Sequence, residues 1–116
     1  MEKKILIIER NDDIREIFED YFSKRYAVKS ISSGDLLNNF SINDFELLIW
    51  DYHKYDKLGL SIALEFISND RPVIISTTGY MEMRLDFRLH TLPRIIKPYT
   101  LEELDFVISL ALILSK

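Results

Sequence analysis

One short stretch decides the fold: Leu47-Leu48-Ile49-Trp50-Asp51, four consecutive apolar residues that end in a single acid. A continuous apolar run of this length is typical of a strand buried on both faces of a parallel sheet. Similar runs, each again ending in a polar residue, are Ile5-Leu6-Ile7-Ile8 before Glu9, Val73-Ile74-Ile75-Ser76 before Thr77, and Ile95-Ile96 before Lys97. Because the carboxyl ends of parallel strands share one edge of a sheet, we expect the four terminal polar residues to converge there.

Helical patterns separate these runs. Apolar residues recur at the spacing of an amphipathic helix at Ile14, Ile17, Phe18, Tyr21 and Phe22. Further helices are expected over residues 35–40, 60–67 and 81–89, and from the capping box at 100–103; a polar edge strand is expected over 26–31. The alternation predicts an α/β fold, a (βα)5 doubly wound parallel five-stranded sheet in the order 2-1-3-4-5, as a single domain over residues 1–116.

The composition restricts the partners and the location. The chain has 116 residues, no cysteine and a formal net charge of -4. An acidic chain of this kind does not favour nucleic acid as a partner, because the phosphate backbone requires a basic surface. The longest apolar stretch, Phe106–Leu114, is half the length of a membrane span, and the first residues lack the apolar core of a signal peptide. We therefore expect a cytoplasmic protein that contacts neither nucleic acid nor membrane.

The polar residues, in this strand context, resemble those of the receiver domains of two-component response regulators over the whole chain. That family has an acidic pair after the first strand, Asp after the third, Ser or Thr after the fourth and Lys-Pro after the fifth. Asp51 matches the phospho-acceptor, Thr77 the hydroxyl residue and Lys97-Pro98 the lysine and its proline, and Gly59 matches a glycine of the loop after the acceptor. The resemblance implies a flavodoxin-like topology and a role in phosphorelay signalling as a phosphoprotein, not as an enzyme.

Three positions depart from the family pattern. Glu9-Arg10 stands where two acids are usual, Arg94 where a switch aromatic is usual, and Tyr55 where the loop usually has proline. The second acid normally binds Mg²⁺, so the first departure affects the metal site most. An alternative register takes Asp12-Asp13 as the acidic pair, but it removes both acids from the start of the first helix, where they favour its positive end.

The resemblance also implies a role for each matched residue. Mg²⁺ would be bound by Glu9, Asp51 and the backbone carbonyl of His53. Asp51 would be the nucleophile, and Lys97 and Thr77 would hold the phosphoryl oxygens.

Arg10 changes the charge of this pocket. Glu9 and Asp51 would be balanced by Arg10 and Lys97 without a metal, whereas the usual pocket needs Mg²⁺ to reach neutrality. An Arg10 that points inward would replace the charge of the metal, pair with Asp51 and weaken Mg²⁺ binding. An Arg10 that points outward would leave a weakened metal site. We expect the inward orientation, because the two carboxylates would otherwise face each other partly uncompensated.

The last helix is apolar on two sides. The stripe expected to face the sheet consists of Leu101, Leu104, Ile108, Ala111 and Leu112. Phe106, Leu110 and Ile113 lie on nearly the opposite side, and an exposed apolar patch usually marks a partner surface. Together with Arg94 they are the predicted interaction surface, for a homodimer or for another signalling protein. The alternative is that the helix at 81–89 covers this stripe.

Two functions remain open. The first is a receiver that accepts a phosphoryl group on Asp51 from a sensor histidine kinase and signals by protein docking. The second is a degenerate receiver that acts as a phosphorylation-independent interaction module. Intact Asp51, Thr77 and Lys97 favour the first, with impaired phosphorylation, and Arg94 favours the second. A flavodoxin-like nucleotide binder is a weaker third reading, because no glycine-rich phosphate loop follows the first strand.

Overall fold

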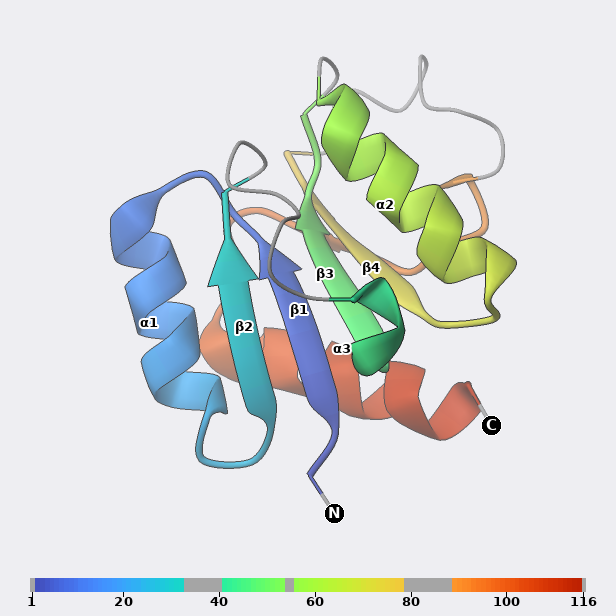
Figure 1. The fold of residues 1–116 in the computed structure, drawn as a ribbon. Coiled ribbons are helices and arrows are strands. Elements are labelled where there is room, and N and C mark those ends of the chain that lie inside the picture. Colours follow the sequence, from blue (N-terminus) through green and yellow to red (C-terminus); the bar gives the residue numbers. More distant parts are fainter. Residues whose placement is uncertain (1, 33–40, 54–55, 79–88, 116) are drawn as a thin grey trace.

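A computed structural model of the chain describes residues 2–32, 41–53, 56–78 and 89–115. Within these ranges, parallel strands form one sheet in the order β2-β1-β3-β4-β5, as the sequence predicts (Figure 1). The strands are β1 (Lys4–Ile8), β2 (Ala27–Ile31), β3 (Leu47–Asp51), β4 (Val73–Thr77) and β5 (Arg94–Ile96). The helix expected over 35–40, nearly all of the one expected over 81–89, and Tyr55 lie outside the described residues.

Helices cover both faces of the sheet. They are α1 (Asp12–Phe22), α2 (Lys57–Ser68), α3 (Leu101–Leu114) and the short 3-10 helix η2 (Ile42–Asp44). Side chains alternate between the two faces of a strand. In β1, Ile5 and Ile7 pack with α1 and α3, while Leu6 and Ile8 pack on the opposite face with α2. Figure 1 shows α2 on one side of the sheet and α3 on the other.

The start of α1 fixes the register of the polar residues after β1. The strand ends at Ile8, and the Asn11 side chain caps the helix by accepting the backbone N–H of Ile14 at 3.1 Å. Asp12 and Asp13 occupy the first turn, where acids stabilise the positive end of a helix. The alternative register, which needs the strand to continue through Asn11, is therefore wrong, and Glu9 and Arg10 are the residues that directly follow β1.

The capping box predicted at the start of α3 is confirmed. Thr100 Oγ1 accepts the backbone N–H of Glu103 at 3.0 Å, and Glu103 Oε1 accepts the backbone N–H of Thr100 at 2.8 Å. The box begins α3 at Leu101, so Lys97 lies in the short segment between the end of β5 and the start of this helix. None of the helices in the described part of the chain has the length and apolar character needed to cross a bilayer.

Candidate functional site

Buried polar side chains gather at the carboxyl edge of the sheet. In the described ranges they are Glu9, Asp51, Ser76 and Thr77. Asp51 ends β3 and pairs in register with Ser76 of β4, and Thr77 is the next residue of that strand. The Thr77 carbonyl accepts the backbone N–H of Lys97 at 2.8 Å, which carries the lysine to the same edge. The structure thus brings the predicted polar residues together, while their chemical roles remain predictions.

Lys97 and Asp51 form the central ion pair of this edge. Lys97 Nζ donates to Asp51 Oδ1 at 2.6 Å, and the Asp51 side chain is 9% exposed. Burial acts to lower the pKa of Lys97, but the hydrogen bond and the charge of Asp51 outweigh it, so the pKa is raised. The ammonium group is therefore held in its charged form beside the carboxylate.

Glu9 lies on the side of Asp51 away from Lys97, and its surroundings disfavour the charged form of its carboxyl group. Its side chain is buried, and Oε2 accepts the backbone N–H of Asn11 at 3.1 Å. Burial raises the pKa of Glu9, the neighbouring Asp51 raises it further, and Asn11 and Lys97 offset part of the rise. Two adjacent carboxylates beside a single ammonium group attract a second positive charge.

The inward orientation expected for Arg10 does not occur. Arg10 is exposed, and Lys97 rather than Arg10 is the ion-pair partner of Asp51. The chain bends at Arg10, between the end of β1 and the start of α1, and there its side chain faces solvent. With Arg10 outside, two carboxylates and one ammonium give the site a formal charge of -1 instead of zero.

The donor atoms present are of the kind that magnesium prefers. Glu9 and Asp51 offer buried carboxylate oxygens, which are the hard ligands that Mg²⁺ prefers. The carbonyl of His53, the third ligand that the sequence predicts, accepts the backbone N–H of Asp56 at 2.9 Å. No group of three or more His, Cys, Asp or Glu residues in the described segments could hold a metal unaided. Mg²⁺ sites often consist of one or two carboxylates, waters and the phosphates of a substrate, and this set matches that kind.

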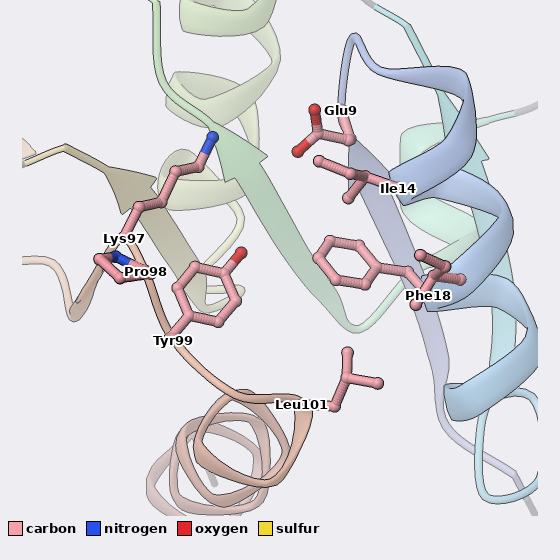
Figure 2. Close-up of a pocket in the computed structure, with 8 residues that line it drawn as sticks. Glu9, Ile14, Phe18, Lys97, Pro98, Tyr99 and Leu101 are labelled. Atoms are coloured by element: carbon pink, nitrogen blue, oxygen red, sulfur yellow. The ribbon is translucent and has the colours of Figure 1, made fainter.

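A pocket of about 330 Å³ opens beside the ion pair, between α1 and the segment after β5 (Figure 2). It is lined by Glu9, Ile14, Ile17, Phe18, Lys97, Pro98, Tyr99 and Leu101. Tyr99 lies against β4, where its hydroxyl is 3.1 Å from Ser76 Oγ, and burial raises the pKa of Tyr99. The pocket therefore has a charged end at Glu9 and Lys97 and otherwise mainly apolar walls.

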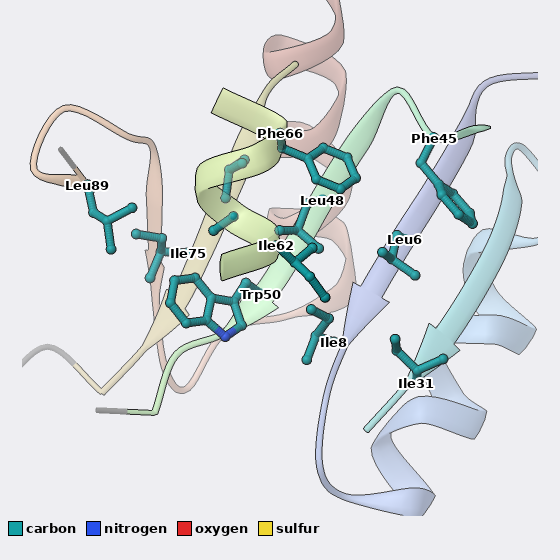
Figure 3. Close-up of a cluster of buried hydrophobic side chains, with 12 residues drawn as sticks. Leu6, Ile8, Ile31, Phe45, Leu48, Trp50, Ile62, Phe66, Ile75 and Leu89 are labelled. Carbon is teal, nitrogen blue, oxygen red and sulfur yellow. The ribbon is translucent and has the colours of Figure 1, made fainter. Parts of the chain in front are cut away.

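Sequence reasoning missed a contact between Trp50 and the start of α2. Trp50 is fully buried beside Ile8, Ile62 and Ile75 (Figure 3), and its Nε1 donates to Asp56 Oδ2 at 3.1 Å. The other oxygen of Asp56 caps α2 by accepting the backbone N–H of Gly59 at 2.8 Å. A Cβ on Gly59 would lie 2.2 Å from Asp56 Oδ2 and 2.5 Å from Trp50 Nε1, which explains the glycine. Trp50 and Asp56 lie six residues apart and belong to no sequence motif, so the sequence carried no signal for this contact.

The predicted interaction surface on α3 is exposed. Phe106 and Ile113 are each 65% exposed and Leu110 is 42% exposed. The inner stripe packs toward the sheet, with Leu104, Ile108 and Ala111 buried, as expected. Arg94 has a different local role: its Nη2 donates to the carbonyls of Leu89 and His90 at 3.3 and 3.1 Å.

Solved structures share this architecture. The response regulator TrrA from Thermotoga maritima, in complex with Mg²⁺-BeF, is 22% identical with a TM-score of 0.72, over 94% of this chain and 98% of that one. Chemotaxis protein CheY4 of Vibrio cholerae is 14% identical with a TM-score of 0.72, over 96% and 99% of the two chains. NtrX of Brucella abortus is 22% identical with a TM-score of 0.75, over 99% of this chain and 27% of that one.

At the level of sequence, no family model matches the chain and no curated protein matches it either. The likeness is therefore one of structure. The protein has the flavodoxin-like receiver fold, with five parallel strands in the order 2-1-3-4-5.

Proposed function

We propose that this protein is a response-regulator receiver domain that accepts a phosphoryl group on Asp51 from a sensor histidine kinase. The observation that carries the proposal is the 2.6 Å pair between Lys97 Nζ and Asp51 Oδ1, at the carboxyl edge of a sheet with the receiver fold. Phosphoryl transfer depends on positioning and on neutralising the charge of the equatorial oxygens. A carboxylate held beside an ammonium group meets both requirements, and such a role implies a cytoplasmic location.

In the transfer, the Asp51 oxygen that Lys97 does not hold forms a bond to phosphorus as the bond from phosphorus to the donor nitrogen breaks. Lys97 then turns its ammonium group to the phosphoryl oxygens, and the hydroxyl of buried Thr77 serves as a second donor to them. Glu9 and Asp51, with the His53 carbonyl, would hold Mg²⁺, which supplies further positive charge on the same oxygens. The protein is the acceptor of the group and not a turnover enzyme.

The same proposal assigns the outer face of α3 to signalling. Its exposed apolar residues, Phe106, Leu110 and Ile113, form a ridge along one side of a single helix. A second copy of the chain can cover such a ridge symmetrically in a homodimer, which buries apolar area on both partners at once. The negative charge added at Asp51 would bias this docking.

A second candidate is a phosphorylation-independent interaction module. The interaction module is favoured because the carboxyl edge has one acid fewer than the receiver pattern. Arg10 stands where that pattern has its second acid, and its side chain faces solvent. With Asp51 already neutralised by Lys97, the fold could display the α3 surface without modification.

Intact mass measurement after incubation with acetyl phosphate, with and without Mg²⁺, separates the two functions. The receiver proposal expects a gain of one phosphoryl group that Mg²⁺ accelerates and that Asp51→Asn abolishes. Asp44→Asn, in η2 far from the carboxyl edge, is the matched control and should gain the group normally. No gain in the wild type under any condition would contradict the proposal and leave the interaction module.

A further inference from the structure

An arginine outside the matched motif reaches the loop that carries Glu9. Arg15, in α1, donates from Nη1 to the backbone carbonyl of Glu9 at 2.6 Å. Its Nη2 pairs with the carboxylate of Asp12, one turn earlier in the helix. The Arg15 side chain is only 17% exposed, so this guanidinium group is a fixed part of the loop. A planar guanidinium group donates from separate nitrogens in a fixed fork, whereas the ammonium group of a lysine is a single point on a flexible stem.

The contact with Arg15 completes a set that holds Glu9 at three points. The backbone N–H of Glu9 donates to the Ile31 carbonyl at 2.9 Å, which extends the pairing of β1 with β2. The Glu9 carboxylate accepts the backbone N–H of Asn11 at 3.1 Å. Arg15 binds the remaining group, the carbonyl. The position of the Glu9 carboxylate beside Asp51 is thus set by neighbours that are themselves held in regular structure.

We propose that Arg15 is a positioning residue, which holds the Glu9 carboxylate beside Asp51 and so sets the affinity of the site for a divalent cation. The inference rests on the proposed function, because it takes Glu9 as a cation ligand there. A site with two carboxylates has no spare ligand, so its affinity depends strongly on how well each one is held in advance. Arg10, the arginine that the sequence places nearest to Glu9, is exposed and takes no part.

The test compares Arg15→Met and Arg15→Lys with a matched control. Arg25→Met removes an arginine that pairs with Asp105, at the far end of α1 from Glu9. The first measurement is a Mg²⁺ titration followed by the fluorescence of Trp50, the only tryptophan of the chain, which is buried and directly precedes Asp51. The second is hydrogen exchange of the Asn11 amide in protein free of Mg²⁺, which reports on the loop without any cation.

Loss of Arg15 should weaken Mg²⁺ binding about tenfold, as is usual when a group that orients a metal ligand is removed. Exchange of the Asn11 amide should rise by a similar factor in Arg15→Met, Arg15→Lys should lie between this variant and wild type, and Arg25→Met should match wild type. A merely structural role would instead lower the melting temperature of both arginine-to-methionine variants and leave the Mg²⁺ midpoint of the folded protein unchanged.

Two outcomes would overturn the inference. They are an unchanged Mg²⁺ midpoint with unchanged Asn11 exchange in Arg15→Met, or a wild type that shows no response to Mg²⁺. If Arg15→Met does not fold, the same two measurements on Arg15→Lys test the inference. Lysine keeps the positive charge but cannot reproduce both contacts of the guanidinium group, with the Glu9 carbonyl and with Asp12. The proposed function fails separately: a wild type that binds Mg²⁺ through Glu9 but gains no phosphoryl group would contradict the receiver role and leave the role of Arg15 intact.

Discussion

Two regions of this molecule reverse the ordinary placement of side chains, and they do so in opposite ways. At the carboxyl edge of the sheet, charged groups are buried, with Glu9 at 4% and Asp51 at 7% exposure. On the outer face of α3, large apolar groups are exposed, with Phe106 and Ile113 at 65%. A buried acid and an exposed apolar patch are the two placements that carry information about function, because neither follows from folding alone.

The difference between the regions lies in where their partners are. Lys97 neutralises Asp51, and Asn11 donates to Glu9, so the buried charges are satisfied inside the chain. The inner stripe of α3 is likewise covered by the sheet, but Phe106 and its neighbours stay uncovered by any residue that the structure describes. Under the proposed function, the buried charges of the edge have their partners within the chain, whereas the exposed apolar residues of α3 would find theirs on a second copy.

The largest effect is expected from the removal of Lys97, the ion-pair partner of Asp51 at the carboxyl edge. Lys97→Met should slow phosphoryl transfer from acetyl phosphate about 100-fold, because one pre-positioned charge at the reacting oxygens is lost. Lys57→Met, at the exposed start of α2, is the matched control. Equal rates of phosphoryl gain in the two variants, followed by intact mass, would show that the ion pair has no role in the chemistry.

The contrast predicts a separate effect on the α3 face. Phe106→Lys combined with Ile113→Lys should weaken self-association by at least about tenfold, because apolar anchors supply most of the energy of a docked interface. Sedimentation velocity over a range of concentrations measures this effect. Leu58→Lys, which changes an exposed leucine of α2, should leave association unchanged.

A monomeric wild type at all concentrations would contradict the homodimer. Loss of association in Leu58→Lys as well would show that the effect comes from net charge and not from the α3 ridge.

The contact between Trp50 and Asp56 should be sensitive to a single methyl group added at Gly59. Gly59→Ala places a Cβ within 2.2 Å of Asp56 Oδ2 and 2.5 Å of Trp50 Nε1, so the cap and the indole must separate. We expect a loss of about 2 kcal/mol in the free energy of unfolding, typical of overpacking, together with a shift of Trp50 emission. Urea denaturation of this variant against Ser61→Ala, an exposed site of the same helix, checks the value.

The smallest predicted effect concerns the ionisation of Glu9. Burial raises the pKa of Glu9 above its unfolded value, so the folded state binds the proton more strongly and loses stability as pH rises through that window. Glu9→Gln removes this loss and should raise the free energy of unfolding by about 1 kcal/mol at neutral pH without Mg²⁺. The gain should vanish in acid, and Glu16→Gln, at an exposed position of α1, is the matched control.

The sequence was sufficient for the fold because its signals are local. Short apolar runs such as Leu47–Trp50, each bounded by polar residues, favour buried strands, and the crossover rule leaves few orders for them. That α3 is apolar on two sides was equally visible in the sequence, since both apolar stripes lie within one helix. The convergence of Asp51, Thr77 and Lys97 followed from the strand ends.

The misjudged parts depend on tertiary geometry. Arg10 turns outward because Glu9 turns inward and α1 begins two residues later, at Asp12. Charge balance alone favoured an inward Arg10, because it takes no account of the direction in which the backbone points each side chain. The contacts of Arg15 with the Glu9 carbonyl and of Trp50 with Asp56 join residues that show no pattern in the sequence.

The central claim is that the phosphoryl group is bound to Asp51. The most direct test is reduction of the phosphorylated protein with borohydride, which converts an aspartyl phosphate to homoserine, followed by mass mapping of the peptides. The account predicts homoserine at position 51, formed only after treatment with the phosphodonor and absent from Asp51→Asn. Conversion at another acid, or no conversion in protein that has gained the group, would contradict it.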